Sequence, residues 1–184
     1  MPTRDPSSAR EARWVLRAQC GDRAALDALL ASVAPPLHRY LLRLTGREDV
    51  ADDVLQEVLL TVCRKLKHVR EPRVFRFWAF RVASRAAFKA LRRHRVEVAF
   101  DDGLADTVGD PKAAAAVEAG LQREAVERLL GSLSPAARAV LSLHYLDGLS
   151  LAEVADVLEL PIGTVKSRLA YGIGALRERG QATR

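Results

Sequence analysis

Hydrophobic residues recur at helical spacing along most of the chain. Apolar side chains return every three to four positions, and no alternating apolar and polar run is long enough to predict a strand. The pattern therefore predicts an all-α protein. Helices are expected at about residues 7–19, 23–33, 37–45, 48–67, 73–95, 121–130, 135–146 and 151–158, and from residue 162 onward.

Proline and glycine mark the expected boundaries of several helices. Pro35 and Pro36 are predicted to separate two helices, because proline lacks the amide hydrogen that helical bonding needs. Pro72 similarly separates the next two helices and biases the residue before it away from helical geometry. Gly46 is expected to close a helix.

The charge divides the chain into three parts. Residues 1–95 hold 20 basic and 10 acidic residues, residues 96–120 hold 1 and 6, and residues 121–184 hold 8 and 7. The middle part also lacks a sustained apolar face, so it is predicted to be a flexible acidic linker between two small helical domains. The predicted divisions are an N-terminal helical extension at 1–21, a first domain at 22–95, the linker at 96–120, a second domain at 121–179 and a tail at 180–184.

Several classes of protein lack support in the sequence. No apolar run approaches the roughly 20 residues that span a bilayer, and the first residues resemble no signal peptide, so a cytoplasmic location without membrane insertion is expected. Cys20 and Cys63 stand apart without a CxxC pattern and are expected to be buried thiols rather than zinc ligands or a disulfide. A phosphate loop, HExxH and GxSxG are absent, so we expect neither an enzyme nor a bound metal or cofactor.

A strongly basic segment covers residues 70–95, with nine positive charges and one negative. This density is typical of surfaces that bind polyanions, although a solvated basic face is the alternative. Helical projection places one aromatic residue and four cations on the same side of the helix: Trp78, Arg81, Arg85, Lys89 and Arg92. Such a side suits contact with a single nucleic-acid strand. Trp78 could equally belong to the core, like Phe77, Phe80, Phe88 and Leu91 on another side.

The helix expected at 48–67 has an acidic outer face. Its buried stripe is predicted to contain Ala51, Val54, Leu55, Val58 and Val62. The residues opposite are mostly acidic and include one exposed leucine: Asp49, Asp53, Gln56, Glu57 and Leu60. Such a face suits a protein interface with a basic partner, and an ordinary solvated face is the alternative.

The last two expected helices form a helix-turn-helix pattern. Ser150 and Glu153 make a capping box, and a turn follows at about Glu159 to Pro161. The second helix is predicted to bury Ile162, Val165, Leu169, Ile173 and Leu176. Outward side chains suited to base or phosphate contacts are Thr164, Lys166, Ser167, Arg168 and Tyr171, and a plain helical hairpin is the alternative. Glu159 stands at a turn position where glycine is common.

These motifs resemble a known family in two places. The run LSPAARAVLSLHYLDGLSLAEVADVLELPIGTVKSRL resembles region 4 of the extracytoplasmic-function sigma factors, group 4 of the sigma-70 family. The runs ADDVLQEVLLTV and FRFWAFRVASRAAFKALRRHR resemble their region 2. The resemblance covers about residues 22–179 and implies a sigma factor that binds core RNA polymerase and directs promoter-specific transcription initiation.

The resemblance also implies roles for particular residues and partners. Asp53, Gln56 and Glu57 match the polymerase-binding motif, and the loop with His68, Arg70 and Arg73 matches one that captures a base of the minus-ten element. Region 2 is expected to bind the polymerase clamp helices, and region 4 the minus-thirty-five element and the flap. The expected protein is a monomer when free of polymerase, with promoter DNA and an anti-sigma factor as further partners.

The sequence departs from the family at two places. Arg85 stands where the family usually has asparagine, and AYGIGAL replaces an arginine-rich tail, which predicts altered minus-thirty-five recognition. The alternative function is a helix-turn-helix regulator that acts without polymerase. Such regulators usually dimerise on symmetric sites, so the symmetry of protected DNA separates the two hypotheses.

Overall fold

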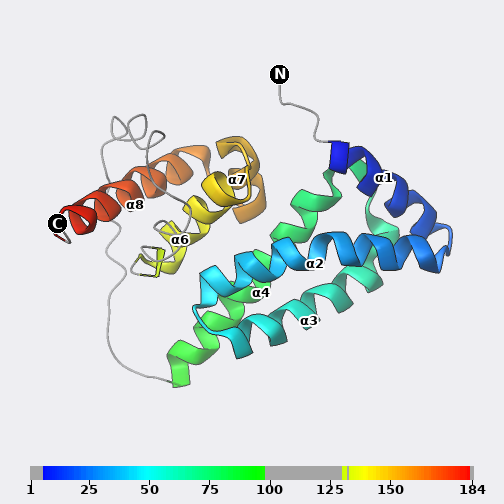
Figure 1. The fold of residues 1–184 in the computed structure, drawn as a ribbon, viewed down its shortest axis with the longest axis horizontal. Coiled ribbons are helices and arrows are strands. Elements are labelled where there is room, and N and C mark those ends of the chain that lie inside the picture. Colours follow the sequence, from blue (N-terminus) through cyan, green and yellow to red (C-terminus); the bar gives the residue numbers. More distant parts are fainter. Residues whose placement is uncertain (1–5, 98–129, 132, 183–184) are drawn as a thin grey trace.

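The computed structural model describes residues 6–97, 130–131 and 133–182, and the regular structure in these ranges is entirely helical (Figure 1). The all-α prediction is therefore confirmed. The α-helices are α1 (Pro6–Gln19), α2 (Arg23–Thr45), α3 (Glu48–Lys65), α4 (Phe75–Glu97), α6 (Pro135–Leu141), α7 (Leu151–Leu158) and α8 (Ile162–Ala182). Short 3-10 turns occur at η1 (Leu66–His68) and η2 (Pro72–Val74), and a π-helical turn occurs at η4 (Ser142–Leu146).

Helices α1 to α4 form the first module, in which α2 packs against the other three (Figure 1). The rings of Tyr40 and of Phe80 on α4 meet at a steep angle, with their centroids 5.6 Å apart. The Tyr40 hydroxyl lies 2.8 Å from the Ser84 hydroxyl, so the buried phenol keeps a hydrogen-bond partner. Burial raises the pKa of Tyr40, which keeps the phenol neutral.

The prediction that Pro35 and Pro36 separate two helices is wrong. Both prolines lie inside the continuous helix α2. The buried side of α2 continues across them without a change of spacing: Ala25, Leu29, Val33, Pro36, Leu37, Tyr40, Leu41 and Leu44. Packing of this long apolar stripe thus outweighs the loss of two amide hydrogens.

The second module consists of α6, η4, α7 and α8 and lies on one side of the first (Figure 1). Ser134 caps α6 by accepting a hydrogen bond from the Ala137 amide, and Pro135 occupies the first turn. Gly148 adopts φ 75° in the turn between η4 and α7. Helix α8 continues to Ala182 and so includes residues predicted to be a tail.

The predictions for the two cysteines and for the linker remain to be compared with the structure. Cys20 and Cys63 are exposed, so their expected burial is wrong; Cys63 follows the buried Val62 by one position and is rotated outward by the helix. Most of the predicted linker at 96–120, and of the helix predicted at 121–130, lies outside the described residues.

Candidate nucleic-acid interface

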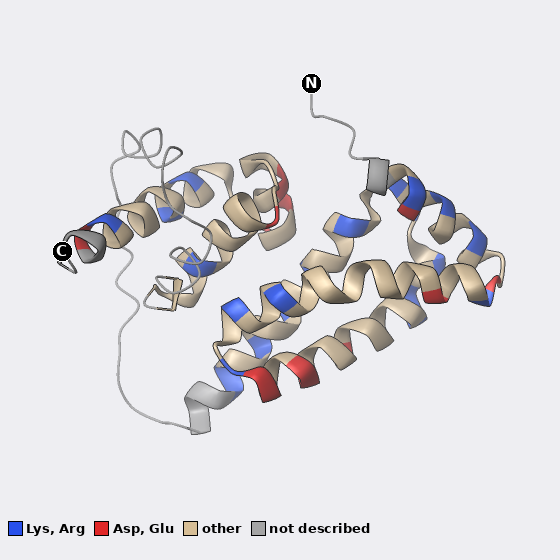
Figure 2. Ribbon diagram, viewed as in Figure 1, with Lys and Arg blue, Asp and Glu red and all other residues tan. Residues whose placement is uncertain are grey.

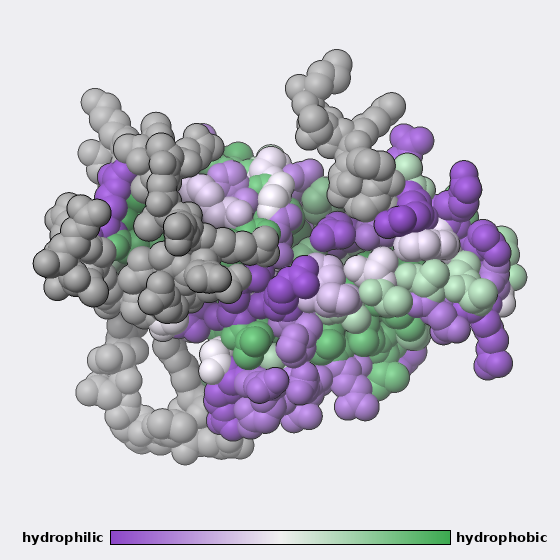
Figure 3. All heavy atoms as spheres, in the orientation of Figure 1, coloured by the Kyte–Doolittle hydropathy of each residue, from purple (hydrophilic) through white to green (hydrophobic). Residues whose placement is uncertain are grey.

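Helix α3 separates a buried side from an acidic exposed side. Its buried residues are Val50, Ala51, Val54, Val58 and Val62, while Leu55 is only half-buried. All five residues predicted for a protein interface are exposed: Asp49, Asp53, Gln56, Glu57 and Leu60. Leu60 keeps 48% of its surface exposed. Acidic segments are visible on α3 in Figure 2, and Figure 3 shows apolar residues gathered over the middle of α2 and α3.

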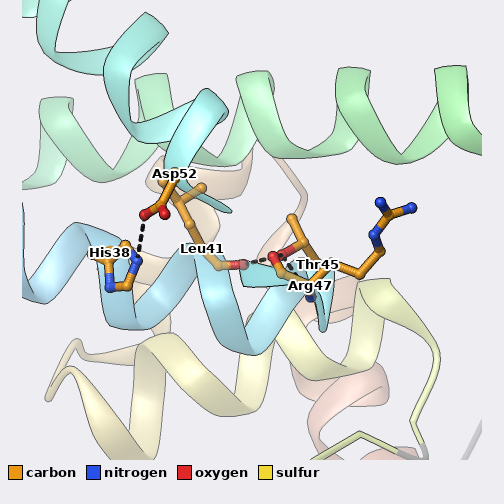
Figure 4. Close-up of polar contacts among 5 residues, drawn as sticks. All are labelled: His38, Leu41, Thr45, Arg47 and Asp52. Atoms are coloured by element: carbon orange, nitrogen blue, oxygen red, sulfur yellow. Dashed lines mark hydrogen bonds and ion pairs between the residues drawn. The ribbon is translucent and has the colours of Figure 1, made fainter. Parts of the chain in front are cut away.

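The corner between α2 and α3 fixes the direction of this acidic side. Gly46 ends α2 with φ 70°, and its amide donates to the Leu42 carbonyl at 2.8 Å. The Thr45 hydroxyl donates to the Leu41 carbonyl at 2.9 Å, and His38 Nε2 lies 2.9 Å from Asp52 Oδ1 (Figure 4). The first two contacts close the end of α2, and the His38–Asp52 contact joins α3 to α2.

The ionised form of Asp49 is favoured locally. The Arg47 guanidinium donates to its carboxylate, with Nε 3.2 Å from Oδ1, and this hydrogen bond lowers the pKa of Asp49. This contact therefore stabilises the negative charge of Asp49 at the start of the exposed face.

Helix α4 presents the predicted basic side. Arg85, Lys89 and Arg92 are exposed, whereas Trp78 and Arg81 are half-buried. The ring centroids of Trp78 and Phe75 are 5.9 Å apart. Trp78 packs against the core and is only partly buried, so part of the indole stays accessible. Phe80 is buried, as predicted, while Phe77, Phe88 and Leu91 are partly buried against the core.

An open groove between α3 and α4 brings the acidic and basic sides together. Its lining includes Glu57 from α3 and Arg85 and Lys89 from α4. Lys89 Nζ lies 3.9 Å from Glu57 Oε1. A residue predicted to bind polymerase thus contacts a residue predicted to bind the minus-ten strand.

Helix α1 supports the loop between α3 and α4. The side-chain amide of Gln19 donates to the backbone carbonyls of Leu66 and Val69, each at 2.9 Å. His68, Arg70 and Arg73 in this loop are exposed. The sequence did not predict the role of Gln19, because its partners lie 47 and 50 positions away.

Helix α8 buries most of the residues that the sequence predicts for its core side. Val165, Leu169, Ile173 and Leu176 are buried, but Ile162 is 47% exposed, so its predicted burial is wrong; it begins the helix before α8 packs on its neighbours. Of the residues predicted to face outward, Lys166 and Tyr171 are exposed, and Thr164, Ser167 and Arg168 are half-buried. The Ser167 hydroxyl donates to the Thr164 carbonyl at 3.0 Å and keeps its lone pairs for other donors.

The two glycines of α8 have different surroundings. A Cβ atom on Gly172 would lie 2.4 Å from Leu141 Cδ1, whereas a Cβ on Gly174 would meet nothing within 4 Å. Gly172 therefore allows α8 and α6 to approach closely, and a basic side chain at this buried position could not reach DNA.

The turn before α8 carries an unusual residue. Glu159 has φ 56° and is the one described non-glycine residue with positive φ. Arg85 of α4 donates from Nε to Glu159 Oε2 at 2.8 Å and from Nη2 to the other oxygen. This hydrogen bond lowers the pKa of Glu159 and raises that of Arg85. The predicted capping box is also present, with the Glu153 carboxylate accepting from the Ser150 amide at 2.8 Å.

A second ion pair joins the modules at a buried position. Arg43 Nη2 of α2 lies 2.6 Å from Asp147 Oδ2, and the two side chains are 8% and 5% exposed. Burial raises the pKa of Asp147, and the Arg43 guanidinium opposes that rise. Arg138 of α6 donates to the Leu44 carbonyl at 3.2 Å, near the C-terminus of α2.

Among the described residues, no group of three or more His, Cys, Asp or Glu side chains is arranged to hold a metal ion. The helices in these ranges are also too short or too polar to cross a membrane.

Sequence comparisons assign this arrangement to a family. The Sigma-70 region 2 family matches residues 29–97, and the Sigma-70 region 4 family matches residues 123–174. The extracytoplasmic-function (ECF) RNA polymerase sigma factor SigL of Mycobacterium tuberculosis is 36% identical over 163 residues, covering 87% of this chain and 91% of SigL. This chain belongs to the ECF sigma factors. The ECF factor SigW of Bacillus subtilis is 25% identical over 169 residues, covering 86% of this chain and 90% of SigW.

Solved structures support the same fold for this ECF sigma factor. CnrH in complex with the cytosolic domain of CnrY has a TM-score of 0.70 at 22% identity, covering 95% of this chain and 99% of that chain. RpoE in complex with the anti-sigma factor NepR from Bartonella quintana has a TM-score of 0.66 at 23% identity, covering 86% and 98%. The family predicted from the motifs is thus confirmed: the protein is a sigma factor that directs promoter-specific transcription by RNA polymerase.

Proposed function

We propose that this sigma factor distributes its binding among three surfaces. A region 2 domain at residues 22–95 carries the polymerase and minus-ten surfaces, and a region 4 domain at residues 121–179 carries the minus-thirty-five surface. Residues 1–21 extend the first domain, and residues 96–120 link the two. The order of the two matched families along the chain supports this division.

The polymerase surface is the acidic side of α3, formed by Asp49, Asp53, Gln56, Glu57 and Leu60. The observation that carries this assignment is that these five side chains are all exposed, opposite an apolar side that is almost wholly buried. Their carboxylates suit basic partner residues, and Leu60 supplies apolar contact area. The proposed partner site is the clamp helices of the core enzyme.

The minus-ten surface combines α4 with the loop before it. Trp78, Arg81, Arg85, Lys89 and Arg92 follow one side of α4, and His68, Arg70 and Arg73 lie in the loop that Gln19 supports. Cations contact the phosphates of the opened strand, while the accessible part of Trp78 stacks on a base.

The minus-thirty-five surface is the outer side of α8. Arg168 reads a base edge, Lys166 contacts phosphate near the helix start, and Thr164, Ser167 and Tyr171 supply hydroxyl groups. Region 4 also contacts the polymerase flap.

In this proposal the protein acts in the cytoplasm, binds its partners without catalysing a reaction, and is a monomer when free of polymerase. An anti-sigma factor is its proposed regulator, because the similar RpoE and CnrH structures are complexes with NepR and with the cytosolic domain of CnrY.

The test reverses charge on the acidic side of α3. Asp53→Arg/Glu57→Arg should weaken binding to core polymerase by more than about tenfold, since like charges would meet across the interface. The control Asp27→Arg/Glu48→Arg makes the same change in net charge at exposed positions outside this surface. Both variants are measured by co-purification with core enzyme and checked by circular dichroism. Normal core binding by a folded Asp53/Glu57 variant would contradict the assignment.

A further inference from the structure

Two residues that the sequence marks as unusual, Arg85 and Glu159, contact each other. Arg85 stands where asparagine is usual, Glu159 stands where glycine is common, and the two form an ion pair across the boundary between regions 2 and 4. We infer that Glu159 is an internal competitor of promoter DNA: in the free protein its carboxylate occupies Arg85, and the opened minus-ten strand displaces it. This inference rests on the proposed assignment of α4 to that strand.

The geometry of the pair suits such competition. The Arg85 guanidinium donates from Nε at 2.8 Å to one Glu159 oxygen and from Nη2 to the other. The planar guanidinium offers the same fork of donors to a carboxylate and to a phosphate. These two donors cannot be engaged by Glu159 and by a DNA phosphate at the same time.

The backbone conformation of Glu159 independently supports this inference. It adopts φ 56° and ψ 46°, the left-handed conformation in which glycine is favoured because it lacks a Cβ. Glycine would close α7 equally well, through the same amide bond to the Ala155 carbonyl. The strained glutamate supplies what glycine cannot, namely a side chain that reaches Arg85.

The next turn of α4 shows the same kind of pairing. Lys89, four positions after Arg85, lies 3.9 Å from the Glu57 carboxylate. Two successive cations of the minus-ten surface are thus paired with carboxylates of the same chain. Because Glu57 belongs to the proposed polymerase surface, docking on polymerase would also release Lys89.

The spacing of promoter elements requires the Arg85–Glu159 pair to break. The minus-ten and minus-thirty-five elements lie roughly 25 base pairs apart, or about 85 Å along the DNA axis at 3.4 Å per base pair. Glu159 lies three residues before α8, so it would move with that helix to the distant element. An Arg85 in contact with Glu159 is therefore incompatible with occupation of both elements.

The test measures binding of the free, full-length protein to a fluorescein-labelled dT12 oligonucleotide by anisotropy at low salt. Glu159→Gln removes the charge and keeps the side-chain size and the backbone strain. The matched control is Asp156→Asn, which makes the same charge change three residues earlier; Asp156 is exposed and has no ion pair among the described residues. Glu159→Gln should tighten binding about threefold to fivefold relative to Asp156→Asn, the size expected for loss of one exposed competing pair.

The Arg85→Ala background tests whether the gain passes through Arg85. Glu159→Gln should give no further gain there, because the cation that it releases is missing. Equal gains for Glu159→Gln and Asp156→Asn, or a gain that persists without Arg85, would overturn the inference. Arg92→Ala in the otherwise unchanged chain tests the DNA surface separately: if it leaves dT12 binding unaltered, the assignment of α4 to the opened strand fails and the inference fails with it.

Discussion

Region 2 and region 4 present their proposed binding residues in different ways. In region 2, the proposed polymerase surface on α3 is exposed and lies opposite the residues that form the core. In region 4, Thr164, Ser167 and Arg168 are half-buried beside the core side of α8, and Gly172 allows that helix to approach Leu141. We therefore expect substitutions on the α3 surface to change binding without changing stability, and substitutions on α8 to change both.

The largest effect is expected where the two regions meet. Asp147→Ala leaves the buried Arg43 guanidinium without its partner, which should lower the free energy of unfolding by about 3–5 kcal/mol. Urea denaturation of the full chain measures this change. By contrast, Glu159→Gln removes an exposed pair and should change stability far less.

The double replacement Arg43→Met/Asp147→Leu is the control for Asp147→Ala. It removes both charges together and should restore most of the lost stability. A negligible effect of Asp147→Ala would mean that the contact between the regions contributes little to the stability of the free protein.

The two glycines of α8 test whether packing controls region 4. Gly172→Ala should destabilise the protein by about 1–3 kcal/mol, because the new methyl group would overlap Leu141. Gly174→Ala should stabilise it by about 1 kcal/mol, because alanine favours the helix and meets open space. Thermal unfolding of the two variants measures the difference; stabilisation by both would show that the α6–α8 contact readily adjusts.

Specific and general DNA contacts in region 4 can also be distinguished. Arg168→Ala should weaken minus-thirty-five binding by roughly 1–3 kcal/mol and relax the preference at one base pair. Lys166→Ala should weaken binding uniformly across sequences and reduce the salt slope by about 1. Binding of holoenzyme to a set of promoter variants measures both, and a uniform loss for Arg168→Ala would instead make Arg168 a phosphate contact.

Local patterns predicted the faces of individual helices well. The acidic side of α3 followed from helical spacing, and its exposure is confirmed. The predicted helix break at Pro35 is wrong, because the local preference of proline is outweighed by the long buried stripe of α2. The pairs Arg43–Asp147 and Arg85–Glu159 join residues 104 and 74 positions apart, so no spacing along the chain could have predicted them.

Promoter-directed initiation by this protein is tested by transcription of genomic DNA fragments by core polymerase with and without it. A sigma factor should give stimulated start sites preceded by two dissimilar elements, with an asymmetric footprint that requires polymerase. A lack of stimulated starts, or a symmetric footprint formed by the protein alone, would contradict this role and favour a free helix-turn-helix regulator.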